Sequence, residues 1–526
     1  MGLKLDLLRD GYLPENLPPT FHTEAIASHF EKNPPTGYYC DLIAPVRPAL
    51  YSASKRGLTR RPFSVLHPGT AYDLAQFVET NELHLTRHFA KSTYSLSTPR
   101  HTPDGVRAVD IASHGELEAE RLQRLSGFRF IAKTDISRFF HSIYTHAVPW
   151  AFHGKAAAKL DRRNASPDVF FNKLDHILRH GQDLQTVGIP VGPDASRYIA
   201  EVIAVAIDVL FNDKHAGSDV AVLRHVDDVW IGAHSHADAE HALWRYREAL
   251  REFELDINES KTRIYAEEFS YTDAWPMDVG SRLEQAIDAG DKLRSALEYA
   301  FAKAVESNDD GVLKFAIRQL DRAHLKPAQW SAVQPFLMRC AVHFGHTVDY
   351  VVRFLVWRKQ VHDDLDEKRW FPILTGVLDR QARLGNDSEV CWLLFAALRL
   401  KIPISPDTAQ KIVANCGALS IVAALHSPVS APFAEAAFAR LQQDTDNGPL
   451  WPLKLEWVTH QLNGHAALEA SPLVDELASA KVSIFDSQRL TKVFVGVERP
   501  QSAIERRVSF YDHDPDPVPD EDNEDF

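Results

Sequence analysis

Two adjacent aspartates, Asp227 and Asp228, stand between two apolar runs of the chain. Val220-Ala-Val-Leu precedes the pair, and Val229-Trp-Ile follows it. Apolar runs that flank a short polar segment predict a β-hairpin, here with carboxylates at its tip. Aspartate is also a common turn residue, because its side chain bonds to nearby backbone, so the hairpin alone indicates no chemistry.

A third carboxylate ends another apolar segment farther upstream. Phe130-Ile-Ala-Lys-Thr-Asp135 predicts a buried strand that leads into an amphipathic segment beginning at Ser137. Three carboxylates on neighbouring strand ends can hold two divalent cations, which activate an attacking hydroxyl and stabilise a leaving pyrophosphate. The pattern therefore predicts a two-metal site made of Asp135, Asp227 and Asp228.

A glycine-containing loop lies between these segments. Gly188-Ile-Pro-Val-Gly192 precedes an apolar-periodic stretch from Pro193 to Asp208, which predicts a long helix capped by Asp194. In this order, the three segments resemble the palm of reverse transcriptases. They match the family's strand with Asp, an apolar residue and a Phe-Phe pair, its Gly-x-Pro-x-Gly loop, and its aromatic-x-Asp-Asp hairpin.

The resemblance implies an α+β fold, namely a right-hand polymerase with fingers and a ferredoxin-like palm whose sheet carries helices on one face. It assigns catalysis and metal binding to Asp135, Asp227 and Asp228. Mg²⁺ is the implied cofactor, in a two-ion site, with Mn²⁺ as the alternative ion. The implied substrates are dNTPs and the implied product is DNA.

A basic cluster, defined as the five basic residues between positions 47 and 61, stands out in a chain of net charge −14. No acidic residue interrupts it. Either a bound anion or a solvated loop explains such a cluster, and the triphosphate of a nucleotide is an anion that Lys and Arg neutralise. The resemblance places Lys55 and Arg61 on the phosphates, with Arg60 as an alternative to Arg61.

Four further residues are assigned to nucleotide binding by the resemblance. Phe140 matches the aromatic residue that crowds the 2′ position of the sugar, and ordinary core packing is its alternative; Phe139 is expected in the core. Pro190 and Gly192 belong to the glycine-containing loop. Lys261 matches the family's Leu-x-x-Asn-x-x-Lys-Thr segment, where it can donate a proton to pyrophosphate; its alternative is a surface lysine at a strand start.

The sequence departs from the family pattern at two positions. Val191 stands where many relatives have Gln, so contacts there must come from backbone or shape, which puts template use in doubt. His225 stands at the aromatic position of the hairpin, where it can stack and can titrate near neutrality.

Long helical periods follow one another beyond about residue 280, which predicts an irregular HEAT-like solenoid that cradles the product or holds subunits together. They are expected at 293–305, 313–323, 330–343, 348–357, 370–383 and 388–400. We predict an N-terminal arm at 1–35, fingers and palm at 36–275, a helical domain at 276–505, and a disordered acidic tail at 506–526.

Other features restrict the class of protein. The four cysteines form no Cys-x-x-Cys pair, which predicts reduced core thiols. His234, His236 and His241 are expected to be solvent-exposed rather than zinc ligands. Without a leader or a long apolar run, a cytoplasmic protein that does not enter membranes is expected. The opening at 12–21 is similar to that of bacterial reverse transcriptases of the abortive-infection and defence-associated groups, which implies an antiphage role.

We therefore predict a DNA polymerase of reverse transcriptase type, in a homo-oligomer held by the helical domain. One version is protein-primed and template-independent. Its alternatives are a templated RNA-directed DNA polymerase that uses a bound RNA, and a non-catalytic scaffold with a degenerate palm that binds RNA or protein. Whether the template is RNA or DNA stays open.

Overall fold

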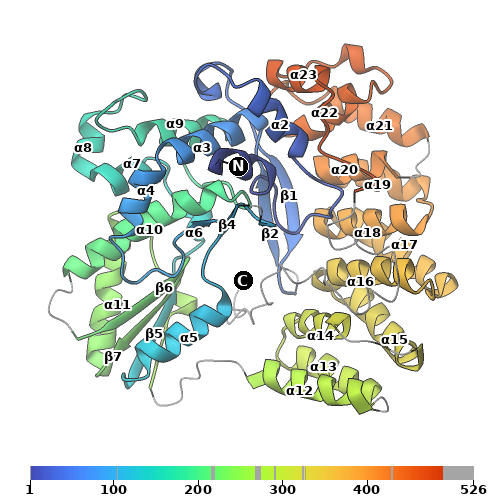
Figure 1. Ribbon diagram of the computed structural model, residues 1–526, viewed down its shortest axis with the longest axis horizontal. Helices are drawn as coiled ribbons and strands as arrows, with labels where there is room; N and C mark the ends of the chain where they lie inside the picture. The colour runs from blue at the N-terminus through green and yellow to red at the C-terminus, as the bar shows by residue number, and fades with distance from the viewer. Residues whose placement is uncertain are drawn as a thin grey trace.

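The computed structural model describes residues 2–57, 59–103, 105–214, 219–266, 274–289, 292–322, 325, 327–427 and 431–489. The palm sheet with its helices and a long helical stack lie on either side of the N-terminal arm and a hairpin (Figure 1). The predicted acidic tail lies outside the described residues. The expected limit at 275 falls within α12 (Ala274–Ala289), and the domain limits stay predictions.

About the first fifth of the chain, up to Asp110, forms the arm, a hairpin and the short elements that follow. Two residues of the basic cluster lie in the hairpin's second strand, where Arg61 stands opposite Ala53 and Arg60 opposite Ser54. The elements are α1 (Leu3–Arg9), α2 (Glu24–Lys32), η1 (Tyr39–Asp41), β1 (Ala49–Ser54), β2 (Arg60–Val65), α3 (Pro68–Thr80), α4 (Glu82–Phe89), β3 (Arg100–His101) and β4 (Val109–Asp110).

The palm sheet has the strand order β6-β7-β5-β8, with every neighbouring pair antiparallel. Its strands are β5 (Phe130–Asp135), β6 (Ala221–His225), β7 (Asp228–Ala233) and β8 (Arg263–Tyr265). Helices α10 (Ala195–Lys214) and α11 (His236–Arg251) pack against one face. The two apolar segments thus form the strands expected, and a hairpin joins β6 to β7.

Helix α5 (His114–Leu125) covers the other face of the palm sheet. Because side chains alternate along a strand, Ile131, Leu223 and Trp230 face α5, while their neighbours join the main core. Helices α10 and α11 thus cover one face, as expected, and α5 adds a helix on the other. A capping box at Ser113 and Glu116 starts α5.

Short helices connect β5 to α10. They are α6 (Phe139–Ser142), α7 (Ala147–His153), α8 (Lys155–Leu160) and α9 (Asn172–His180). The amphipathic segment expected from Ser137 is only the four-residue helix α6, which follows Arg138 with a φ of +46°.

The helical region stacks in two rows, because each helix contacts the helix two positions along the chain. The row α14, α16, α18, α20 and α22 lies nearer the hairpin, the row α15, α17, α19 and α21 lies on its far side, and α12 and α13 form one end of the stack (Figure 1). All six helical periods expected from the sequence are helices. The bounds are α13 (Leu293–Glu306), α14 (Gly311–Arg322), α15 (Pro327–His343), η3 (Gly345–Thr347), α16 (Val348–Val361), α17 (Glu367–Leu384), α18 (Asp387–Leu400), α19 (Pro406–Asn415), α20 (Ala418–Leu425), α21 (Ala431–Leu441), α22 (Trp451–Thr459), η4 (His465–Ala467) and α23 (Pro472–Ser479).

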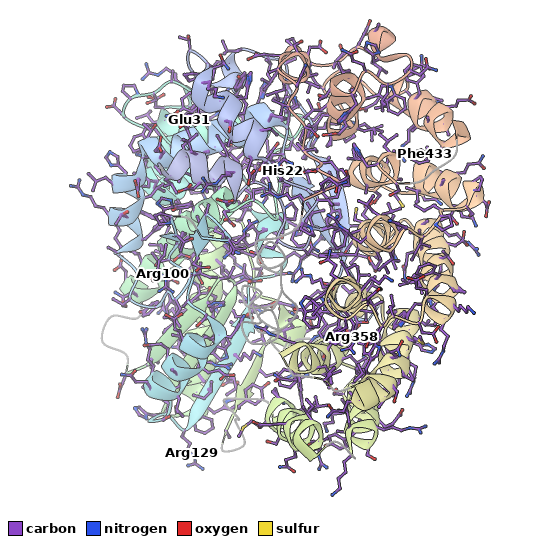
Figure 2. All side chains as sticks on the ribbon, turned by 45° about the vertical axis from the view of Figure 1, so that its right-hand side comes forward. His22, Glu31, Arg100, Arg129, Arg358 and Phe433 are labelled. Carbon is purple, nitrogen blue, oxygen red and sulfur yellow. The ribbon has the colours of Figure 1, made fainter. Side chains whose placement is uncertain are left out.

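Side chains fill the stack, and some of its buried charged groups are paired. Arg358, labelled in Figure 2, is buried in α16 with its guanidinium 4.3 Å from the Trp330 ring centroid. It also pairs with Asp364. All four cysteines are buried and free, as expected. Among the described helices, none combines the length and apolarity that crossing a bilayer requires.

Candidate active site

The three aspartates meet at one end of the palm sheet. Asp135, the last residue of β5, lies directly opposite Asp228, the first residue of β7. Asp227 occupies the turn between β6 and β7, and its carbonyl accepts a hydrogen bond from the Ile136 amide at 3.1 Å. The sheet pairing thus brings together the carboxylates that the sequence singled out.

The charges around Asp227 oppose one another. Burial and the negative charge of Asp135 raise the pKa of Asp227 to about 6, whereas the positive charges of Arg61 and Lys261 lower it. Lys261 Nζ lies 3.3 Å from Asp135 Oδ2. Crowded carboxylate oxygens are the donors that hard divalent cations take, so the residues present fit a metal site.

A buried ion cluster, which sequence reasoning missed, fixes the hairpin on α10. The fully buried Arg224 guanidinium donates to Glu201 and Asp208 at 2.8–3.1 Å, and to the carbonyl of Val226 at 3.1 Å. Val226 has a φ of +56°, a conformation that costs free energy for a branched side chain. The sequence did contain a signal for this cluster, namely Arg224 within an apolar strand. A buried arginine requires carboxylate partners, so such a residue predicts an ion cluster.

His225 has a different role from the one expected. Its ring is buried, and Nε2 donates to the carbonyl of Ala112 at 3.0 Å. Burial lowers the pKa of His225 to about 4, so the imidazole is neutral at pH 7. The expectation that it titrates near neutrality was wrong, because burial favours the uncharged ring more strongly than the bond to the Ala112 carbonyl favours the charged one.

The glycine-containing loop requires both of its glycines. Gly188 and Gly192 have φ values of +89° and +118°, and a Cβ on Gly192 would lie 3.1 Å from the ring of Phe63. Pro190 is buried between them. The carbonyl of Val191 accepts from the Ser64 amide at 2.8 Å. The loop is therefore tied to β2, the strand that carries Arg61.

Asp194 stands at the N-cap position of α10, but its carboxylate bonds elsewhere. It accepts from the Arg107 guanidinium at 2.6 Å and from the Val109 amide at 3.2 Å. Arg107 also donates to the carbonyl of Gly192 at 3.2 Å. The expected capping role was therefore wrong, because the partly buried Arg107 and the Val109 amide bind the carboxylate instead.

Most arginines of the basic cluster pair within the protein. Arg47 pairs with Asp183, Arg56 with Asp309, and Arg60 with Glu389. Arg60 therefore cannot replace Arg61 as a phosphate ligand. Carboxylates far along the chain, rather than one bound anion or solvent, explain this part of the cluster.

Arg61 and Lys55 lie on the same hairpin. The Arg61 side chain is exposed, and its charge lowers the pKa of Asp227 and of Glu15. Lys55 lies in the turn of the hairpin, where its amide donates to the Thr59 carbonyl at 2.9 Å. The structure thus brings Arg61 toward the aspartates, and the nucleotide roles of both residues stay predictions.

Phe139 and Phe140 follow β5, the strand that ends in Asp135. Phe139 is buried in the core, as expected, and its ring meets that of Phe140 edge-on, with centroids 5.7 Å apart. Phe140 is half-buried, and its carbonyl accepts from the Ile189 amide at 2.8 Å. Phe140 therefore adjoins the glycine-containing loop.

Two groups among the described residues have ligand atoms that all lie within 4.8 Å of one another, Cys40–Asp41–His176 and His426–Glu456–His460; the three aspartates do not form such a group. In each, protein donors already bind the carboxylate: Lys173 donates to Asp41 at 2.8 Å, and the Ile484 amide to Glu456 at 2.6 Å. The histidines at 234 and 236 are exposed and lie near single carboxylates.

Comparison with known proteins places most of this site in one family. A family model described as reverse transcriptase (RNA-dependent DNA polymerase) matches residues 70–273, a range that includes the three aspartates, Phe140, the glycine-containing loop and Lys261. No curated protein matches the chain. One solved structure that it resembles is telomerase from Candida albicans in complex with a TWJ fragment of telomeric RNA.

The resemblance to that telomerase has 11% identity and a TM-score of 0.29, covering 79% of this chain and 67% of the other. At this TM-score it supports no further argument. The family match implies nucleotide substrates, a nucleic-acid template and dependence on a divalent metal. Residues 70–273 are therefore a reverse transcriptase domain, and the chain is a nucleotidyltransferase of the reverse transcriptase type.

Proposed function

We propose that the chain is a DNA polymerase that adds dNTPs to a growing DNA end, with Asp135, Asp227 and Asp228 as ligands of two Mg²⁺ ions. The observation that carries this proposal is the meeting of three carboxylates at facing ends of β5 and β7, where the charge of Asp135 raises the pKa of Asp227. When bound, the metal pair lowers the pKa of the attacking hydroxyl and neutralises charge on the triphosphate. Mn²⁺ is the alternative ion.

The remaining residues bind and orient the nucleotide. Arg61 and Lys55 neutralise the phosphates from the hairpin. Lys261, held beside Asp135, donates a proton to the departing pyrophosphate. Phe140 closes the space beside the 2′ position of the sugar. Because Val191 has no hydrogen-bonding side chain, the loop around Pro190 and Gly192 acts by shape and by its backbone.

Incorporation of single labelled dNTPs tests this function directly. The purified full chain is incubated with Mg²⁺ and each dNTP, with and without an annealed template-primer, and the products are resolved on a denaturing gel. We expect labelled DNA that disappears with EDTA. A chain that gives no metal-dependent label with any dNTP, with or without nucleic acid, contradicts the proposal.

We further propose that synthesis starts on a hydroxyl of the protein and proceeds without a template. The net charge of −14 repels a free template-primer, and internal pairing of Arg47, Arg56 and Arg60 leaves less of the basic cluster to attract one. Label that stays with the denatured protein and is released by DNase is the expected result.

The family's description as RNA-dependent favours the second candidate, templated synthesis on a bound RNA. Templated synthesis would be supported if labelled DNA forms only when a template-primer is added, or if it forms only when the protein has not been treated with RNase.

The biological role that we propose is antiphage defence by a homo-oligomer. The role is supported by the similarity of residues 12–21 to defence-associated reverse transcriptases, and the oligomer by the extended surface of the helical region. Phage plating on cells with the wild-type chain or with an Asp227→Asn and Asp228→Asn variant tests the role. Light scattering of the full chain tests the proposed homo-oligomer. A mass equal to that of a monomer would contradict it.

A further inference from the structure

The β1–β2 hairpin, which carries the proposed phosphate ligands, is a separate two-stranded sheet in the described structure. Isolated two-stranded hairpins are marginally stable in water. Its position relative to the aspartates must therefore be set by what it docks against.

The helical region supplies that support through carboxylates at the starts of two inner-row helices. Just before α14, Asp309 Oδ1 lies 3.0 Å from Arg56 Nε, and Asp310 Oδ2 accepts from the Gly57 amide at 3.2 Å. These two contacts hold the turn of the hairpin. The docking side chains are buried, with Arg56 and Asp309 exposed by 5% and 7%.

The second support lies at the start of α18. Asp387 Oδ2 accepts from the Ser52 amide at 3.1 Å, which occupies a backbone donor on the edge of β1. Glu389, exposed by 2%, binds Arg60 through both of its oxygens at 2.5 and 3.0 Å. Bidentate arginine–carboxylate pairs fix geometry as well as position, and breaking a buried one is costly.

The opposite edge of the hairpin reaches the catalytic domain. Arg60 and Arg61 are neighbours in β2, so their side chains point to opposite faces of the strand. Arg60 is bound to Glu389, while Arg61 acts on the pKa of Asp227. The Ser64 amide donates to the carbonyl of Val191 in the glycine-containing loop. The hairpin therefore bridges the helical region and the active site.

We propose that Asp309, Asp310, Asp387 and Glu389 of the helical region are positioning residues for the incoming nucleotide, because they hold the hairpin where Arg61 acts beside the catalytic aspartates. This inference rests on the proposed function. It makes the helical region part of the nucleotide-binding apparatus, in addition to any contact with product or with a second copy of the chain.

Steady-state kinetics with a single dNTP test the proposal. Glu389→Gln keeps the shape of the side chain but removes the charge, and Arg60→Gln breaks the same pair from the hairpin side. Each is expected to raise KM for dNTP roughly tenfold, as loss of a charged hydrogen bond would, with kcat within about twofold, because binding rather than chemistry is weakened. Arg60→Lys, which keeps the charge without the bidentate geometry, is expected to fall between.

Hydrogen–deuterium exchange of the intact chain gives a readout that does not need activity. Exchange of residues 49–65 is expected to be faster in both Gln variants and unchanged in Glu298→Gln. Glu298 pairs with Arg339 at 2.6 Å within the helical region and exposes 57% of its side chain, so its variant is the matched control.

The outcomes separate this proposal from the proposed function. An active wild-type chain whose KM does not move in the Gln variants, or whose hairpin exchange does not change, overturns the positioning role alone. A fall in kcat without a change in KM also overturns it. A wild-type chain that incorporates no nucleotide overturns the proposed function, and this inference falls with it.

Discussion

At the scale of single residues, the candidate site holds negative charge that Lys261 and Arg61 offset only in part. Asp227 has a folded pKa of about 6, above its usual value near 4. When no cation is bound, the folded chain therefore loses stability as the pH rises from about 4 through about 6, where Asp227 ionises first in the unfolded and then in the folded state. A bound divalent cation makes the ionised carboxylates stabilising instead, so metal affinity and folding stability are linked at this site.

We expect Asp227→Asn together with Asp228→Asn to abolish dNTP incorporation while preserving the fold. At pH 8 without divalent ions, the melting temperature should equal or exceed that of the wild type, because the repulsion with Asp135 is removed. Added Mg²⁺ should raise the melting temperature of the wild type only. Asp219→Asn is the control, because Asp219 is exposed and lies outside the site. Incorporation at the wild-type level in the double variant would rule out the metal assignment.

Phe140→Ala is expected to raise the use of rNTPs relative to dNTPs by about tenfold or more. Phe140 is half-buried and its backbone adjoins the glycine-containing loop, so truncation opens space beside the sugar rather than in the core. The measurement is the ratio of kcat/KM for each nucleotide pair. Phe139→Leu, in the core, should lower stability without moving that ratio; an unmoved ratio in Phe140→Ala would place the sugar gate elsewhere.

At the scale of elements, the sequence predicts well what is local. The strands at 130–135 and 221–233 and the helices beyond 280 follow from periodicity, and the aspartates meet because their strands pair. Contacts between distant segments are not readable in this way. The pairing of Arg60 with Glu389, 329 residues apart, carries no local signal, so Arg60 looked like a phosphate ligand. Likewise, the bond of His225 to the carbonyl of Ala112, 113 residues earlier, has no local signal in the sequence.

The Arg224 cluster joins two such elements, β6 and α10, and its loss should be costly. Arg224→Met leaves Glu201 and Asp208 buried without their cation, which is expected to lower the free energy of unfolding by about 3–5 kcal/mol. Urea denaturation followed by circular dichroism measures it. Adding Glu201→Gln and Asp208→Asn should recover part of the loss; a variant as stable as the wild type would show that the cluster does not fix the hairpin.

At the scale of the whole molecule, the polymerase half and the helical half share one hydrophobic core. Two buried tryptophans of the inner row reach across: Trp392 Nε1 donates to the carbonyl of Asn16 at 2.8 Å, and Trp451 Nε1 to that of Val65 at 3.4 Å. The rings of Phe21 and Phe485 also meet, with centroids 5.1 Å apart. The helical region therefore completes the surroundings of the arm and the hairpin.

We therefore expect a chain truncated after residue 266 not to fold cooperatively, although it keeps nearly all of the reverse transcriptase match at 70–273. Removing the helical half exposes the apolar surface that Trp392 and Trp451 cover, and it leaves Arg56 and Arg60 without their carboxylates. Near-ultraviolet circular dichroism through a urea titration should show no sharp transition. Co-expression of residues 274–526 as a separate chain should restore it, because the missing contacts are non-covalent. A truncated chain that unfolds in one sharp step, with the m-value expected for its length, would show that the polymerase half is an independent folding unit.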